Sequence, residues 1–186
     1  MTLALMLVAA YILGAIPCSY LVVKMLTGQD IRQIGSGNPG TMNVLDHVGL
    51  TPALLVGAAD LGKGAVAVGL AYYVGLEDSG AGLAGLFVVL GHIWSIFLRL
   101  NGGNGTGPTV GAVFALLPVA TLLAVLISFL VWRLIGSRRL AGLAGLLAVV
   151  PIACVLAMPQ IPIIAAAGLV GLLFVKLWHF EGFAVA

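Results

Sequence analysis

The stretch TLALMLVAAYILGAIPCSYLVV, residues 2–23, decides the fold, because no charged residue interrupts it. An apolar run of about 18 residues or more is long enough to cross the hydrocarbon core of a bilayer as a helix. This run is too long for the apolar part of a signal peptide and shows no clear cleavage pattern, so we expect a helix that is retained. Residues 2–23 therefore predict a membrane-spanning segment.

The composition of the whole chain supports a membrane protein. Of its 186 residues, 62% are hydrophobic and only 8% are charged, whereas soluble domains carry about 25% charged residues. The mean hydropathy of +1.22 points the same way. We predict a single all-α transmembrane domain over residues 1–186, a compact bundle of about seven transmembrane helices with glycine-rich cytoplasmic loops. The apolar segments are residues 2–23, 50–76, 80–98, 107–136, 139–158 and 160–178.

The number of crossings depends on the segment 107–136, which is too long for one comfortable crossing and carries Pro118 near its middle. Basic residues accumulate on the cytoplasmic side of membrane proteins. If the chain turns back at Pro118, the cations near the ends of the apolar segments all share one membrane face, whereas a single crossing places Arg138 and Arg139 on the other face. We therefore expect about seven crossings of the inner membrane, with the N-terminus outside and the C-terminus in the cytoplasm. The cations are Lys24, Arg32, Arg99, Arg133, Arg138, Arg139 and Lys176.

The formal net charge of +2 is explained by this topology. We therefore expect the lipid bilayer, and no nucleic acid, as a partner. The two cysteines, Cys18 and Cys154, both lie in apolar segments, and so few predict neither a disulfide nor a metal site.

The loop that follows the first apolar segment contains IGSGNPGTMN, residues 34–43, with a literal G-x-G-x-x-G. A dinucleotide-binding site would need a strand before these glycines, and the upstream segment is a membrane span instead. The loop suits an anion-binding nest of backbone N–H groups, to which hydroxyl and amide side chains add donors. An ordinary solvated loop with turn-forming glycines explains the residues equally well. The polar side chains of this loop are Ser36, Asn38, Thr41, Asn43, Asp46 and His47.

A second glycine-dense stretch, RLNGGNGTGPT at residues 99–109, opens the next predicted helix. A helix N-terminus with free N–H groups and the positive end of the helix dipole can bind a phosphate. The Gly-Lys-Ser/Thr ending of a nucleotide-binding P-loop is absent.

Two further polar elements stand out against the apolar background. Asp60 and Lys63 lie in a transmembrane segment, three residues apart and therefore on one helix face. They form either an ion pair that only holds helices together or a direct contact with a ligand. His179 and Glu181 follow the last apolar run in LWHFEGF. They are either an ordinary polar tail after an interfacial Trp178 or part of a site, which their return to the face of the glycine loops favours.

Taken together, four motifs resemble those of the bacterial acyl-phosphate:glycerol-3-phosphate acyltransferases, a family of integral membrane enzymes, over nearly the whole chain. The motifs are Y-I-L-G-A-I-P-x-S-Y, D-I-R-Q-I-G-S-G-N-P-G-T-M-N-V-L, D-L-G-K-G-A and G-H-I-W-S-I-F-L-R-L-N-G-G-N-G-T, in that family's order. The resemblance implies transfer of a fatty acyl group from acyl phosphate to the 1-hydroxyl of glycerol 3-phosphate or a related acceptor. The product would be lysophosphatidic acid, an intermediate of phospholipid synthesis. No cofactor and no metal are expected.

The resemblance also implies roles for individual residues. Ser36 and His179 are the candidate catalytic residues. The candidate substrate-binding residues are Gly37, Asn38, Thr41, Asn43, Asp46, Lys63, Gly102, Gly103, Asn104, Gly105 and Glu181.

Three positions depart from the family's pattern. Asp46 stands where an arginine usually follows N-V-L, Asn104 stands in place of a lysine in G-G-K-G, and Gly182 stands in place of the asparagine of His-x-x-Asn. Loss of these groups weakens phosphate binding unless Arg32, Arg99 or Lys63 compensates. The alternative function is that of a diverged, non-enzymatic relative that binds or transports a lipid or a small polar solute.

Overall fold

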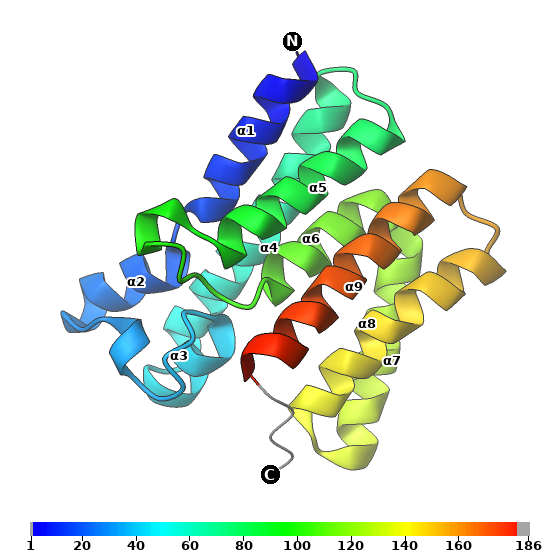
Figure 1. Cartoon of the computed structure of the whole chain (residues 1–186). Helices are drawn as coiled ribbons and strands as arrows, with labels where there is room; N and C mark the ends of the chain where they lie inside the picture. The colour runs from blue at the N-terminus through cyan, green and yellow to red at the C-terminus, as the bar shows by residue number, and fades with distance from the viewer. Residues whose placement is uncertain (1, 182–186) are drawn as a thin grey trace.

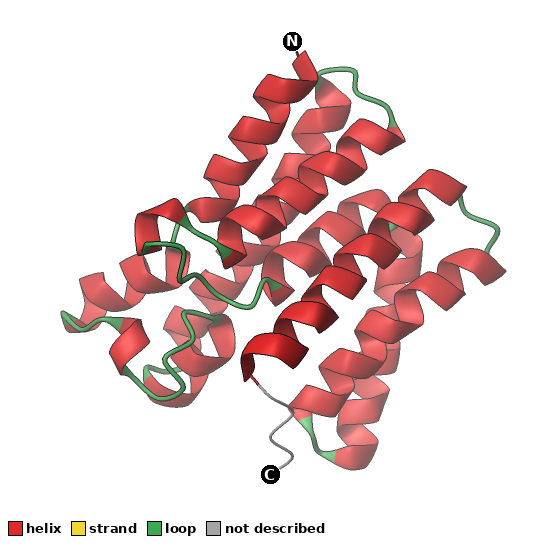
Figure 2. Cartoon of the chain, viewed as in Figure 1, coloured by secondary structure: helices red, strands yellow, loops and turns green. Residues whose placement is uncertain are grey.

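The computed structural model describes the backbone of residues 2–181 and the side chains of residues 2–178. Within this part the chain consists of helices joined by short loops and contains no strand (Figures 1 and 2). The all-α prediction is confirmed. The elements are α1 (Thr2–Ala15), α2 (Cys18–Thr27), the 3₁₀ helix η1 (Ile31–Gln33), α3 (Thr41–His47), α4 (Leu50–Tyr73), α5 (Asp78–Ile93), the 3₁₀ helix η2 (Ile96–Leu98), α6 (Thr106–Leu116), α7 (Pro118–Ile135), α8 (Arg138–Val155) and α9 (Gln160–Glu181).

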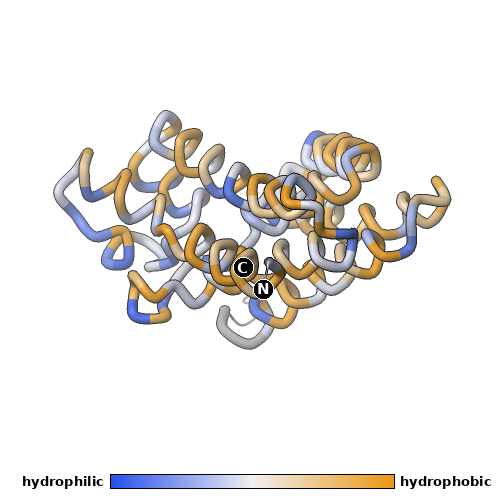
Figure 3. Tube along the Cα trace, turned by 90° about the horizontal axis from the view of Figure 1, so that it is seen from above, coloured by the Kyte–Doolittle hydropathy of each residue, from blue (hydrophilic) through white to orange (hydrophobic). Residues whose placement is uncertain are grey.

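Six segments are long and apolar enough to cross a membrane, and α6 is a shorter apolar helix. Hydrophilic residues are confined to short stretches of an otherwise hydrophobic trace (Figure 3). The predicted turn at Pro118 is confirmed, because α6 ends at Leu116 and Pro118 opens α7. Proline is favoured in the first turn of a helix, where its missing N–H has no partner to lose. The six segments are Thr2–Thr27, Leu50–Tyr73, Asp78–Leu98, Pro118–Ile135, Arg138–Val155 and Gln160–Trp178.

The first apolar segment is broken into α1 and α2 at Pro17, which differs from the continuous helix expected over residues 2–23. Proline removes a helical hydrogen bond and frees the carbonyl groups before it. The Ser95 hydroxyl donates to the Ala15 carbonyl oxygen at 2.6 Å, and Lys63 Nζ donates to the Ile16 carbonyl oxygen at 3.3 Å. A break inside a membrane segment is tolerated where neighbouring groups satisfy the backbone in this way.

Glycines bring two pairs of helices into backbone contact. A Cβ at Gly14 of α1 would overlap the Val88 carbonyl group of α5, and a Cβ at Gly111 of α6 would overlap the Leu61 carbonyl oxygen of α4. Small residues at membrane helix interfaces allow this close approach, and van der Waals packing then stabilises the pair. The central bundle of α1, α4, α5 and α6 is therefore tightly packed.

The helices α7 and α8 form a hairpin at the edge of this bundle (Figure 1). Within the hairpin, the Ser128 hydroxyl donates to the Ala141 carbonyl oxygen at 2.8 Å, and Gly145 lies against Ser128. Only 17% of the α7 span is buried, against 61% of the span that contains α5. Most of the α7 surface is therefore left for lipid.

The two glycine loops lie toward the same end of the bundle as α3, the α7–α8 turn and the C-terminal end of α9 (Figure 1). The N-terminus and the α4–α5 loop lie toward the opposite end. This arrangement agrees with the predicted topology, in which the loops that carry cations share the cytoplasmic face.

Candidate active site

Three ionisable side chains form a cluster inside the central bundle. Asp60 and Lys63 lie one turn apart on α4, and His92 lies near the end of α5. Lys63 Nζ is 2.9 Å from Asp60 Oδ1, and His92 Nδ1 is 3.7 Å from the same oxygen. None of the three side chains is more than 8% exposed. The ion pair predicted from the sequence is therefore present, because a buried charge needs an opposite charge beside it.

A further buried polar group lies on the neighbouring helix α6. Among the described residues, the Thr109 hydroxyl is buried without a hydrogen-bond partner. Buried polar groups normally have such partners. Thr109 therefore marks this region as polar in a way that packing alone does not require.

The second glycine loop, residues 99–105, is anchored by the backbone of Ser95. The Ser95 carbonyl oxygen accepts hydrogen bonds from the N–H groups of Leu98 at 3.1 Å and Leu100 at 2.8 Å. Arg99 and Leu100 both adopt positive φ angles, of 55° and 64°. Residues with a Cβ rarely adopt this conformation, and such strain gathers at ligand sites where the surroundings hold it.

The glycines of this loop lie directly against His92. A Cβ at Gly102 would overlap the His92 carbonyl oxygen, and a Cβ at Gly103 would overlap Nε2 of the imidazole ring. The Gly102 N–H donates to the Ile93 carbonyl oxygen at 3.1 Å. Glycine is needed at both positions because the end of α5 is too close for a side chain.

The same loop delivers free backbone donors to the site. Among the described residues, the N–H groups of Gly103, Thr106 and Gly107 make no hydrogen bond. Thr106 and Gly107 lie in the first turn of α6, which leaves such groups unpaired at the positive end of the helix dipole, and Gly103 precedes this turn by three residues. The start of α6 also lies over the cluster, because a Cβ at Gly107 would be 2.7 Å from Asp60 Cβ. An anion beside this turn would meet several donors at once.

Asn43 organises the first glycine loop, residues 34–40. Its side-chain nitrogen donates to the carbonyl oxygens of Ile34 at 2.9 Å and Asn38 at 3.1 Å, and its side-chain oxygen accepts from the Ser36 N–H at 3.2 Å. An amide nitrogen has two donors, and the loop consumes both. Asn43 therefore fixes the shape of the loop, and its direct contact with a substrate stays a prediction.

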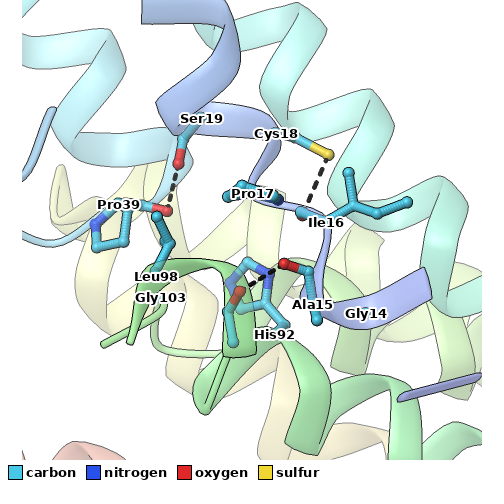
Figure 4. A pocket seen from close by; sticks show the side chains of 11 residues that line it. Gly14, Ala15, Ile16, Pro17, Cys18, Ser19, Pro39, His92, Leu98 and Gly103 are labelled. Atoms are coloured by element: carbon cyan, nitrogen blue, oxygen red, sulfur yellow. Dashed lines mark hydrogen bonds between the residues drawn. The ribbon is translucent and has the colours of Figure 1, made fainter. Parts of the chain in front are cut away.

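The two glycine loops meet at Pro39. The Ser19 hydroxyl donates to the Pro39 carbonyl oxygen at 2.7 Å, and this oxygen is 3.1 Å from the Cβ position of Gly103. A small pocket opens at the junction, where His92 lies beside the break at Pro17 (Figure 4). Its lining consists of Gly14, Ala15, Ile16, Pro17, Cys18, Ser19, Pro39, His92, Ser95, Leu98 and Gly103. Two loops that are distant in the sequence thus share one small pocket.

Other predicted residues lie around this junction without lining the pocket. Ser36 is exposed, and its hydroxyl accepts a hydrogen bond from the Asn38 N–H at 3.4 Å. Thr41 is half-buried, with its methyl group 3.3 Å from the Cβ position of Gly57 on α4. Asn104 is half-buried in the second loop. Their contacts with substrate stay predictions, as do those of Gly37 and Gly105, which adopt positive φ angles of 73° and 90°.

Asp46 forms an ion pair with a distant residue. Arg138 Nη2, at the start of α8, lies 3.1 Å from Asp46 Oδ1 at the end of α3. The two side chains are 54% and 44% exposed, so solvent screens the pair. The negative charge of Asp46 is therefore balanced by Arg138, a cation that was explained from the sequence only by its side of the membrane.

Arg32 is also held by a carboxylate. Its Nη2 is 2.6 Å from Asp30 Oδ2, and its guanidinium lies over the Tyr20 ring at 5.5 Å. Hydrogen bonds from Arg32 lower the pKa of Asp30 below its ordinary value. Arg32 is therefore engaged within its own loop, which argues against its acting as a spare phosphate ligand.

The C-terminal candidates are only partly covered by the structure. His179 and Glu181 fall in the last turn of α9, but their side chains lie outside the described residues, as does the whole of Gly182. Their roles stay predictions.

Sequence reasoning missed three residues of the pocket, namely Ser19, His92 and Ser95. All three are buried polar residues within or next to apolar segments. Polar side chains at membrane depth are functional candidates by default. This signal was present in the motifs that contain Pro17 and His92, but the contacts that give it meaning come from distant parts of the chain.

Comparisons with known proteins agree on one family. A model of the family described as glycerol-3-phosphate acyltransferase matches residues 4–182. Glycerol-3-phosphate acyltransferase 1 of Dehalococcoides mccartyi is 46% identical over 114 residues, which are 61% of this chain and 55% of that relative. Across four curated relatives that it matches, the chain spans 52–63% of their length.

Two crystal structures of PlsY (YgiH), an integral membrane glycerol 3-phosphate acyltransferase, share the fold. The glycerol 3-phosphate form is 26% identical with a TM-score of 0.88, and the match covers 95% of this chain and 88% of that one. The lysophosphatidic acid form is 27% identical with a TM-score of 0.82 and the same coverage.

Proposed function

The chain belongs to the glycerol-3-phosphate acyltransferase family, and we propose that it transfers a fatty acyl group from acyl phosphate to the 1-hydroxyl of glycerol 3-phosphate. The observation that carries this proposal is the meeting of two glycine loops over a buried polar cluster, with N–H groups at the start of α6 that hydrogen-bond to none of the described residues. The two bound forms of PlsY support the acceptor and the product. The chain is a multi-pass membrane protein, which places it where a fatty acyl donor is found.

The reaction requires little covalent chemistry from the protein. The 1-hydroxyl oxygen of the acceptor forms a bond to the acyl carbon, and the bond between this carbon and the phosphate oxygen breaks. The hydroxyl proton passes to a base, and the products are lysophosphatidic acid and inorganic phosphate. Acyl phosphate is an activated mixed anhydride, so neither a thioester cofactor nor a metal is demanded. The protein must orient the reactants and stabilise negative charge.

The described residues suit these tasks. Backbone N–H groups of Gly103, Thr106 and Gly107 can donate to a phosphate or to the oxyanion. The Lys63 charge is already balanced by Asp60, so the backbone donors carry more of the anion binding. The base is His179, as the sequence predicts, or a phosphate oxygen of the acceptor itself.

The proposal is tested with purified protein in detergent micelles or bilayer discs. Acyl phosphate and isotopically labelled glycerol 3-phosphate should give labelled lysophosphatidic acid and phosphate in equal amounts. Gly102→Leu should abolish turnover because a side chain there meets the His92 carbonyl oxygen, whereas Gly142→Leu on α8 points into open space and should remain active. Binding of glycerol 3-phosphate without turnover would overturn the proposal in favour of a non-enzymatic, ligand-binding relative.

A further inference from the structure

We propose that His92 is a positioning residue for acyl transfer, acting as the support on which the second glycine loop rests. This inference rests on the proposed function and adds a residue to it. His92 does not need to touch a substrate in this role. Its imidazole sets the place of Gly103 and, through it, the direction of the free N–H groups that lead into α6.

The first observation is the contact between His92 and the loop. Nε2 of the ring occupies the space in which a Cβ at Gly103 would lie, and the ring Cε1 is 3.2 Å from that position. The His92 carbonyl oxygen fills the corresponding space at Gly102. One residue thus limits the approach of two successive loop residues, through its side chain and its backbone.

The second observation is that this contact also reaches the first glycine loop. The Cβ position of Gly103 is 3.1 Å from the Pro39 carbonyl oxygen, which Ser19 holds by a hydrogen bond. Gly103 therefore lies between His92 and Pro39. A shift of the imidazole would change the spacing between the two loops as well as the position of one of them.

The third observation explains why a polar ring is suited to this position. The Nδ1 edge faces Asp60, at 3.7 Å from Oδ1, while the Nε2 edge faces Gly103. The ring therefore spans the distance from the ion pair on α4 to the loop. An apolar side chain of the same size would place no polar edge beside the buried carboxylate.

Substitutions of His92 by glutamine and by asparagine test the two edges of the ring separately. A glutamine amide can reach the place of Nε2, whereas the shorter asparagine amide reaches only the place of Nδ1. If His92 acts through Gly103, His92→Gln retains activity within about tenfold, and His92→Asn falls with His92→Ala by about 100-fold in kcat, the scale of a 1 Å misplacement. The KM for glycerol 3-phosphate should rise together with the fall in kcat, because the displaced N–H groups bind the substrate phosphate, and thermal stability should be similar for all three variants.

A double-variant cycle tests the contact itself. Gly103→Ala should lower kcat by about 100-fold in the wild-type background, because its methyl group meets the imidazole. In the His92→Ala background the ring is gone, so the same change should cost less than about tenfold. Gly105→Ala is the matched control, since its methyl group meets Ile93 and Val89 instead, and its φ of 90° strains any residue with a Cβ. Its cost should be the same in both backgrounds.

The wild type, the two single variants and the double variant at positions 92 and 103 are also titrated with glycerol 3-phosphate and with inorganic phosphate, which gives the dissociation constant of each protein. The titration can therefore be read even if the wild-type protein proves inactive, an outcome that would overturn the proposed function while the support of the second glycine loop by His92 is still tested. Non-additive effects of positions 92 and 103 on binding or turnover support the inference. Independent effects, or equal losses in His92→Gln and His92→Asn, overturn it.

Discussion

The central bundle and the α7–α8 hairpin are both built from apolar helices, yet they pack in different ways. In the bundle, Gly14 and Gly111 bring helix backbones into contact, and Asp60, Lys63 and His92 lie buried between the helices. In the hairpin, α7 presents a row of large side chains outward, among them Leu122, Leu126 and Phe129. The spans that contain α5 and α7 have almost the same hydropathy, although they are 61% and 17% buried.

This difference in burial at equal hydropathy shows that hydropathy identifies membrane helices but does not tell which of them pack around the candidate site. Lipid is as apolar as a leucine side chain, so burial between helices is favoured by close packing and polar contacts instead. Glycines and buried polar residues therefore mark the part of this chain that contains the candidate site. Three substitution experiments test this contrast, each with a matched change in or near the hairpin.

The largest effect is expected at the buried ion pair. Lys63→Met leaves the Asp60 carboxylate buried without its cation, which should destabilise the folded protein by about 3–5 kcal/mol. The matched change Arg133→Met, on the exposed end of α7, should alter stability by less than about 1 kcal/mol. Unfolding in mixed detergent micelles measures both. Asp60→Leu combined with Lys63→Met should recover most of the loss, and failure to do so would show that the charges have another essential role.

The next effect concerns the glycine contacts. Gly111→Ala places a methyl group against the Leu61 carbonyl oxygen and should cost about 1–3 kcal/mol, as overpacking does. Gly142→Ala on α8 meets nothing nearby and should be neutral or slightly stabilising, because alanine favours helices. Equal costs at the two positions would contradict the packing contrast. The same unfolding assay applies, with membrane insertion of each variant checked beforehand.

The smallest effect is expected at the exposed pair of Asp46 and Arg138, which joins α3 to the α7–α8 hairpin. Arg138→Gln should cost about 0.2–1 kcal/mol, and the cost should shrink as salt is raised. The exchanged variant, Asp46→Arg with Arg138→Asp, should restore the pair and its salt dependence. If Arg138→Gln instead raises the KM for glycerol 3-phosphate many-fold with stability unchanged, Arg138 serves the substrate and not the contact.

Much of the fold could be predicted from local patterns. Apolar length gave the spans, and Pro118 with the positive-inside rule gave the turn between α6 and α7. The break at Pro17 was not predicted, because a proline in an apolar segment kinks or breaks the helix according to which neighbours satisfy its carbonyl groups. Those neighbours, Lys63 and Ser95, come from other helices.

The candidate site was predictable only in outline. Both glycine loops and Lys63 stood out as candidates from residue types and spacing, since glycine clusters and buried charges are rare in membrane spans, but these signals left an ordinary loop and a purely structural ion pair equally open. The junction was not found, because it depends on contacts such as Ser19 with Pro39 and Gly103 with His92. The partner of Asp46 lies 92 residues away in the sequence, and nothing local points to it.

The central claim is that the substrate phosphate binds where the two glycine loops meet, and a structure determined with glycerol 3-phosphate tests it most directly. We expect phosphate density within hydrogen-bonding distance of the N–H groups of Gly103, Thr106 and Gly107, with the glycerol moiety directed toward the pocket beside His92. Density beside Arg138 at the α7–α8 turn, with the loop junction empty at saturating ligand, would contradict the account.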